Sequence, residues 1–329
     1  MTRAEDTAEP QPVDQTGEER QPTVRRRPPR GAGLLTTMLG AFCLTAALLL
    51  PLVVAPRLAL LPAEFHYTWT LLDPHATYLD TAHWQTRENV EVKQTVSTRG
   101  TPVPGAPGLV AVATTIDTHG PLGAIGFLEY QRVVDRASGR IVDCCGTSGA
   151  GSGARTGLWP PGTAEAAFAF HDPETHAAPV MRLDGIEDRD GLTVHRYRQE
   201  IPPTRVPGSV RDVPAAALGL DRKGTVRAER WVEAVRVYWV EPSSGQVVDL
   251  AEQRRETLRA LDSDHERLLL DADLEAVPSQ VGRARHLADT QVRLLRAVQE
   301  WGPLVLGVCG AVLVASGMLL ARRAARATS

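Results

Sequence analysis

The clearest covalent chemistry in this sequence belongs to two adjacent cysteines, Cys144 and Cys145. No Cys-x-x-Cys motif is present, so the spacing does not indicate redox catalysis. In an oxidising compartment the pair is expected to form a vicinal disulfide. Such a bridge joins Cα atoms about 3.8 Å apart, closer than in ordinary disulfides. An intermolecular bridge and two free thiols are the alternatives.

A group of possible metal ligands lies close together in the sequence: His171, Asp172, Glu174 and His176. The spacing matches no two-histidine helical motif, and Pro173 interrupts a helix there. We therefore expect a polar loop and no metal site. The sequence also shows no Gly-x-Ser-x-Gly elbow and no obvious grouping of serine, histidine and aspartate. These patterns identify no catalytic residue and no cofactor, and we expect a protein that is not an enzyme.

Two stretches of the chain resemble each other. One reads Val-Asp-Arg-Ala-Ser-Gly over residues 134–139, and the other reads Val-Glu-Pro-Ser-Ser-Gly over residues 240–245. Glycine supplies the left-handed backbone of a turn, and proline presets φ at its start. The pattern predicts two hairpins, with the turn residues Asp135, Gly139, Glu241, Pro242 and Gly245. Either the two acidic side chains form a paired site or each caps its own turn, and turn chemistry favours the second.

Alternation of apolar and polar residues predicts strands through the middle of the chain. Residues 89–98 place valines on one parity, and residues 229–240 are apolar on both parities, which is typical of a central strand. Further candidate strands cover residues 108–116, 126–134, 192–201 and 268–274. We therefore expect a mainly β domain over residues 57–277. The repeated turns indicate two related β subdomains or two equivalent hairpins in one sheet.

Two long apolar segments, residues 34–55 and 303–320, bracket this β-rich region. Each is long enough to cross a hydrocarbon core of about 30 Å as a helix. We expect transmembrane helices over residues 31–56 and 302–321. Neither apolar segment contains an ionisable side chain, which favours anchors over an ion pathway.

A helical pattern precedes the second apolar segment. Apolar residues recur at helical spacing from Val281 to Val298, which predicts a juxtamembrane helix over residues 278–301. Trp301 is a residue type that anchors helices at the membrane interface. Gly302-Pro303 is expected to break or kink the chain at that point.

Basic residues set the expected orientation. Residues 1–30 are polar and are expected to form a disordered cytoplasmic tail. Arginines 25, 26, 27 and 30 precede the first span, whereas only Arg57 lies close behind it. The apolar run is longer than that of a signal peptide, which favours an uncleaved anchor. We therefore expect a two-pass protein of the plasma (cytoplasmic) membrane, with a C-terminal cytoplasmic tail over residues 322–329 and an extracytoplasmic middle domain.

Composition restricts the partners. The chain has 329 residues, a formal net charge of -3 and 43% hydrophobic residues. A near-neutral charge balance argues against a nucleic-acid partner, because such proteins carry a basic field. The membrane is therefore the expected partner, together with lipid or other envelope proteins.

Three motifs carry a resemblance to a known family: a Val-Asp-Arg-x-Thr/Ser-Gly turn at residues 134–139, a strand region at residues 185–199 with Gly191-Leu192 and Tyr197, and a Trp-Val-Glu-Pro-x-Thr/Ser-Gly turn at residues 239–245. Serine stands where the family has threonine before both turn glycines. On these motifs the chain resembles an actinobacterial membrane-anchored envelope family of unknown function, sometimes labelled the porin PorA family. The resemblance covers about residues 30–323 and carries over no functional residues.

The expected layout suggests a function. A β domain anchored at both ends is similar in layout to the scavenger receptor class B family, which passes lipids through an ectodomain tunnel. This similarity favours a cell-envelope protein that binds or transfers a lipid or other apolar ligand, and it predicts an apolar cavity. A structural protein that organises envelope complexes is the alternative. The family label adds a porin, although an outer-membrane pore requires a closed barrel with an outward apolar band.

Overall fold

The computed structural model describes residues 31–146, 151–162 and 165–326. The chain divides into two compact units, one formed by Leu44–Val308 and the other by the chain on either side of it. The larger unit contains the described strands, and the smaller unit contains most of two apolar helices. The predicted disordered tail, residues 1–30, lies outside the described residues.

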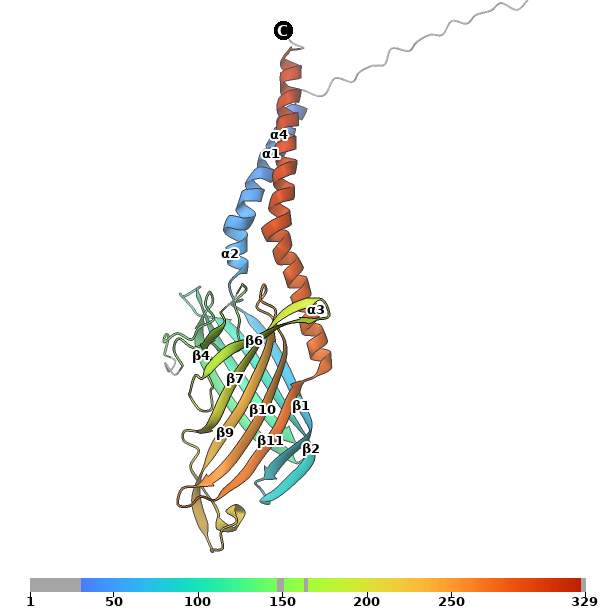
Figure 1. The fold of residues 1–329 in the computed structure, drawn as a ribbon. Coiled ribbons are helices and arrows are strands. Elements are labelled where there is room, and N and C mark those ends of the chain that lie inside the picture. Colours follow the sequence, from blue (N-terminus) through green and yellow to red (C-terminus); the bar gives the residue numbers. More distant parts are fainter. Residues whose placement is uncertain (1–30, 147–150, 163–164, 327–329) are drawn as a thin grey trace, which may run out of the picture. The chain divides into compact units, whose positions relative to one another are not determined.

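Within the described residues, eleven strands form one antiparallel sheet. They are β1 Phe65–Asp80, β2 Gln85–Pro102, β3 Leu109–Gly120, β4 Gly123–Asp135, β5 Ala167–Ala169, β6 Val180–Arg189, β7 Leu192–Arg205, β8 Arg211–Pro214, β9 Thr225–Val240, β10 Val247–Ala260 and β11 Glu266–Ala276. Their order across the sheet is β4-β3-β2-β1-β11-β10-β9-β7-β6-β5, and β8 pairs with β9 outside this path. The sheet curls, so its inward face encloses an interior (Figure 1).

Short bridges link the two edges of the curled sheet. Val134, at the end of β4, pairs with Ile141. Arg155 pairs with Arg140 on one side and with Phe170, directly after β5, on the other. The segment between β4 and β5 therefore connects the two edge strands and covers backbone groups that an open edge would expose.

The prediction of a mainly β domain is confirmed. The predicted strands fall within β2, β3, β4, β7, β9 and β11. The sequence patterns miss β1, where the pairing register shifts near Asp73-Pro74, and β10, which carries six successive polar residues from Glu252. The alternation of residues also predicts none of the strands β5, β6 and β8. All strands belong to one sheet, so the repeated turns are equivalent features of one sheet.

An aromatic cluster fills part of the interior. Trp159 lies between Phe170, Tyr197 and Tyr238, with ring centroids 5.9, 6.1 and 5.0 Å from its own. Trp159 and Tyr197 are almost completely buried. Offset aromatic contacts of this kind stabilise a core beyond the burial of their area.

Two continuous helices precede and follow the sheet in sequence. The first comprises α1 Ala32–Leu49, the π turn η1 Leu50–Val54 and α2 Ala55–Leu58. The second comprises α3 Pro278–Arg296, the π turn η3 Ala297–Trp301 and α4 Gly302–Arg326. Both are long and apolar enough to cross a membrane, so both are candidate membrane spans.

Of the expected break or kink at Gly302-Pro303, the break is wrong, because the second helix continues through it; the kink stays a prediction. Proline lacks an N–H group, and its ring contacts the preceding helical turn. The π turn η3 lies directly before Pro303 and accommodates this change of hydrogen bonding. The helix also extends to Arg326, so the described part of the predicted C-terminal tail is helical.

In the smaller unit, α1 and α4 contact each other through glycines seven residues apart. A Cβ atom at Gly40 would lie 2.8 Å from the carbonyl oxygen of Gly310, and one at Gly317 would lie 2.8 Å from that of Gly33. All four glycines are buried. Small residues at these positions therefore allow close backbone packing within one chain.

Candidate functional site

Charged side chains on β10 point into the curled sheet. Glu252, Arg254 and Glu256 are buried, whereas the intervening Gln253 and Arg255 are exposed. Successive side chains on a strand face opposite sides, so three alternating charges share the inward face. The inward face of β10 is therefore charged, although the inward face of a β domain is expected to be apolar.

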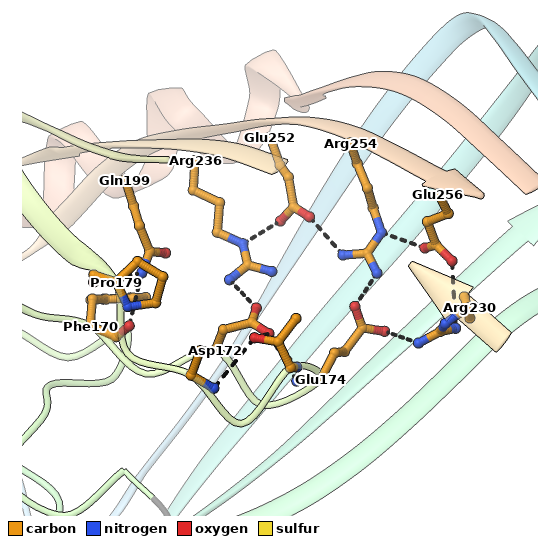
Figure 2. A network of polar contacts seen from close by, with 12 residues as sticks. Phe170, Asp172, Glu174, Pro179, Gln199, Arg230, Arg236, Glu252, Arg254 and Glu256 are labelled. Atoms are coloured by element: carbon orange, nitrogen blue, oxygen red, sulfur yellow. Dashed lines mark hydrogen bonds and ion pairs between the residues drawn. The ribbon is translucent and has the colours of Figure 1, made fainter. Parts of the chain in front are cut away.

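Seven side chains, of which Arg230 and Glu174 are partly buried and the rest buried, form a network that we call the ion ladder: Asp172, Glu174, Arg230, Arg236, Glu252, Arg254 and Glu256 (Figure 2). At one end, Arg236 on β9 donates to Asp172 over 2.7 Å and to Glu252 over 2.9 Å. Arg236 is 6% exposed and Asp172 is fully buried. Glu252 thus joins this end to the rest of the ladder.

The other half of the ladder centres on Arg254. Its guanidinium donates to Glu252 over 2.9 Å and to Glu256 over 2.6 Å, and it also contacts Glu174. Arg230 completes the ladder by donating to Glu174 over 2.8 Å. Every carboxylate of the ladder has an arginine partner, as buried charges require.

A loop between β5 and β6 carries the two ladder carboxylates that are not on strands. Gln199 on β7 holds both ends of this loop, because its Nε2 donates to the carbonyls of Phe170 (2.8 Å) and Pro179 (3.1 Å) (Figure 2). Asp172 Oδ1 accepts hydrogen bonds from the backbone N–H and the hydroxyl of Thr175, each over 2.7 Å. These contacts fix the loop inside the sheet.

The electrostatics of the ladder favour its charged form. Burial raises the pKa of Asp172, but the charge of Arg236 and the hydrogen bonds from Thr175 outweigh it and lower the pKa to about 2. For Glu252, burial is likewise outweighed by Arg236 and Arg254, so its pKa lies below its ordinary value. Asp172 and Glu252 therefore stay ionised at neutral pH.

The histidine-acidic segment does not gather as a metal site. Asp172 and Glu174 pair with arginines, and His171 accepts a hydrogen bond from Arg132 over 3.2 Å. Among the described residues, no group of three histidine, cysteine or acidic side chains is placed to hold a metal ion. The sequence patterns missed the burial of this segment, because polar loops usually lie on the surface.

The two repeated turns have the same geometry. Asp135 Oδ1 accepts hydrogen bonds from the N–H and hydroxyl of Ser138 (2.8 and 2.7 Å). Glu241 Oε2 accepts the corresponding bonds from Ser244 (2.7 and 2.6 Å). In the first turn Gly139 has φ 69°. Each acidic side chain thus caps its own turn.

Both turns pack against one segment of the chain, Leu158, Trp159 and Pro160. A Cβ atom at Gly139 would lie 2.8 Å from the ring of Pro160, and one at Gly245, where φ is 71°, would lie 2.0 Å from the carbonyl oxygen of Trp159. Glycine is therefore required by both space and backbone conformation. The two sequence motifs act together to hold this segment.

The structure places two further predicted residues near these turns. Pro242 accepts a hydrogen bond at its carbonyl from the N–H of Gly162 over 2.9 Å. Cys144 and Cys145 follow Val142, which bonds to β4, and their sulfur atoms lie at bonding distance, 2.01 Å. Their oxidation in the cell remains a prediction.

A cavity of about 490 Å³, which we call the entrance cavity, opens beside α3. Its apolar lining includes Leu58, Phe65, Leu158, Trp159, Leu287 and Leu294. Polar groups from Gln280, Arg283 and Gln291 also line it. Leu58 ends the first apolar helix and Leu294 precedes the second apolar stretch, so the entrance cavity lies where both candidate spans join the sheet.

Three further cavities continue from the entrance cavity through the sheet. The inner cavity, about 90 Å³, shares Gly157 with the entrance cavity. A third, about 50 Å³, shares Arg236 and Glu252 with the inner cavity. A fourth, about 480 Å³, shares Arg230 and Glu256 with the third. The ion ladder therefore occupies the narrow middle of a row of cavities.

Comparison with known proteins bears on the whole of this architecture. A family model described as Porin PorA matches residues 32–319, a range that contains the entire sheet and most of both apolar helices. No curated protein matches the chain.

Proposed function

The chain belongs to the porin PorA family, and on that premise we propose that it binds a lipid or another apolar chain in the entrance cavity. In this proposal it is a two-pass protein of the plasma membrane, with both termini in the cytoplasm and the β domain outside. Its task is to take the apolar ligand from the membrane and hold or transfer it, and the proposal includes no catalytic step.

The entrance cavity is the observation that carries this proposal. Leu287 and Leu294 of α3 are 49% and 57% exposed although both line the cavity. Exposed apolar groups in a concave site are typical of a ligand-binding surface. Because the cavity lies where the spans join the sheet, an acyl chain can enter it from the membrane without crossing the charged interior.

The ion ladder supports this proposal over a pore. Ladder residues line the two narrow cavities of about 90 and 50 Å³, and each ladder carboxylate pairs with at least one ladder arginine. The outward faces of the strands also carry charges such as Glu91, Lys93 and Arg255, which are exposed. A membrane-spanning barrel needs an apolar band at such positions.

Photo-crosslinking tests the proposal. Full-length protein in nanodiscs is irradiated with a lipid that carries a diazirine on its acyl chain, and labelled peptides are mapped by mass spectrometry. We expect labelling of α3 and of the segment around Trp159. Leu287→Glu places a charge in the cavity and should remove most of this labelling.

The matched control is Leu261→Glu, because Leu261 is similarly exposed, 46%, and does not line the entrance cavity. Equal labelling in both variants, or labelling confined to α1 and α4, would contradict the proposal. Capture of a specific envelope protein in the absence of cavity labelling would favour the alternative role of organising envelope complexes.

A further inference from the structure

Arg132 on β4 is a buried arginine without a carboxylate partner among the described residues. It is 8% exposed and lines the inner cavity. Its Nη1 donates to the carbonyl of Gln131 over 2.8 Å, and its Nη2 donates to His171 Nε2 over 3.2 Å. Its Nε is buried and makes no hydrogen bond. The three ladder arginines, by contrast, each contact at least two carboxylates.

In the described part of the chain, the surroundings of Arg132 supply no carboxylate, and the ring of Tyr130, whose centroid lies 5.7 Å from the guanidinium carbon, does not neutralise its charge. Burial and the positive charge of Arg132 lower the pKa of His171 to about 4, so His171 is neutral at pH 7. The ladder holds four carboxylates and three arginines, and this excess negative charge weakens the positive field at Arg132. No carboxylate oxygen of the ladder accepts a hydrogen bond from Arg132 Nε. Burying an uncompensated cation is costly, which favours an anion from outside the chain.

Two other polar groups beside the inner cavity are also unsatisfied. Thr156 Oγ1 and His171 Nδ1 are buried and have no hydrogen-bond partner. Both residues line the same cavity as Arg132. His171 accepts from Arg132 at Nε2, so in its neutral form the proton lies on Nδ1. Unsatisfied buried polar groups are rare in native proteins and mark a missing partner.

The inner cavity joins the entrance cavity. Both are lined by Tyr67, Trp69, Gly157 and Leu158. A Cβ atom at Gly157 would meet no atom within 4 Å, so the junction is open. The volume of about 90 Å³ is several times the minimum that one water molecule requires. A ligand can therefore place its chain in the apolar outer cavity and its head group beside Arg132.

We propose that the ligand is an anionic amphiphile whose carboxylate or phosphate head group binds to Arg132, with Thr156 as an additional donor. This inference rests on the proposed binding of an apolar chain and adds the charge of the head group. Arginine suits this role because its planar donors match the oxygens of both anions.

The test compares photoreactive palmitate with photoreactive hexadecanol, which share a chain and differ in charge. Crosslinking to the full-length protein in nanodiscs is measured against probe concentration. Wild-type protein should bind palmitate at least about tenfold more tightly. Arg132→Gln should weaken palmitate binding about tenfold to a hundredfold, or about 1.4–2.8 kcal/mol, and change hexadecanol binding less than about twofold. Arg132→Lys should restore part of the preference.

Arg255→Gln is the control, because Arg255 is exposed on β10 and pairs with Asp271 at the surface. Without ligand, Arg132→Gln should be no less stable to urea than the wild type, because it removes an unpaired buried charge. Equal binding of both probes by wild-type and Arg132→Gln protein would overturn the inference and leave the proposed function standing. Binding of neither probe would overturn both.

A competition experiment distinguishes an anionic amphiphile from a free anion as the ligand of Arg132. Dodecyl phosphate should displace photoreactive palmitate, whereas inorganic phosphate at the same concentration should not, because it has no chain to occupy the entrance cavity. If inorganic phosphate displaced the probe as effectively as dodecyl phosphate, Arg132 would bind a free anion, and the proposal of an amphiphilic ligand would be overturned.

Discussion

Replacing Arg236 with methionine should destabilise the β domain strongly. Arg236 is 6% exposed and donates to Asp172 over 2.7 Å and to Glu252 over 2.9 Å. Glu252 keeps Arg254 as a partner after the substitution, but Asp172 loses its one arginine partner among the described residues while remaining fully buried. Removing one member of a buried pair costs about 3–5 kcal/mol, so Arg236→Met should lower the free energy of unfolding by that amount.

A double-mutant cycle isolates the pair. Asp172→Asn removes the charge that Arg236→Met leaves unpaired, so the double variant should lose less stability than the sum of the single variants. The expected coupling is about 1–3 kcal/mol, as for residues in direct contact. Arg255→Met is the matched control on the same sheet, because the pair of Arg255 with Asp271 is about half exposed. It should cost less than about 1 kcal/mol.

The assay is urea unfolding of the full-length protein in non-ionic detergent, followed by tryptophan fluorescence. Urea is preferred to guanidinium chloride, because the salt would screen ion pairs. A cost of Arg236→Met below about 1 kcal/mol, or strict additivity of the two substitutions, would show that the ladder is not a coupled buried network.

Three further predictions follow from the structure. Gly245→Ala should cost more than about 2 kcal/mol in urea unfolding, whereas Gly208→Ala, with the same φ of 71° and no neighbour within 4 Å, should cost about 1 kcal/mol. Stability should fall as pH decreases from about 6.5 to 4, because His171 has a folded pKa of about 4 and the unfolded chain takes up its proton first. Stability should fall further between about pH 4 and 2, because Asp172 has a folded pKa of about 2 and is protonated first in the unfolded chain. Urea unfolding midpoints measured over a pH series check both decreases. The adjacent cysteine pair should resist alkylation until it is reduced, as peptide mapping would show.

Sequence patterns predict the parts of this fold that are determined by residues close together in the chain. Two apolar stretches identify the spans, and alternation identifies strands such as β2 and β9. The repeated turns are also local, because Asp135 and Glu241 each bond to residues within three positions along the chain. These features need no knowledge of which segments meet in space.

The candidate site depends on long-range contacts and could not be predicted in the same way. Glu252, Arg254 and Glu256 alternate as a solvated strand face would, and these three residues alone do not show that this face turns inward. Asp172 lies 64 residues from Arg236 in the chain. The rest of β10 carries a local signal. Apolar residues precede and follow the three charges at the same alternate positions of the strand, so the face that carries the charges is otherwise apolar.

The contact of both repeated turns with one segment also lies beyond sequence patterns. Gly139 and Gly245 meet Leu158, Trp159 and Pro160 from different parts of the sheet. This contact gives the family motifs a physical role, because the segment they hold forms a wall of the entrance cavity.

The most direct test of the account identifies what occupies the entrance cavity in cells. A photoreactive phenylalanine analogue replaces Leu294, which lines the cavity, and the intact protein is weighed after irradiation of living cells. We predict a covalent adduct with the mass of an anionic acyl lipid at this position and none at Leu261. A protein adduct at Leu294, or no adduct at either position, would contradict the central claim that the cavity binds an apolar chain.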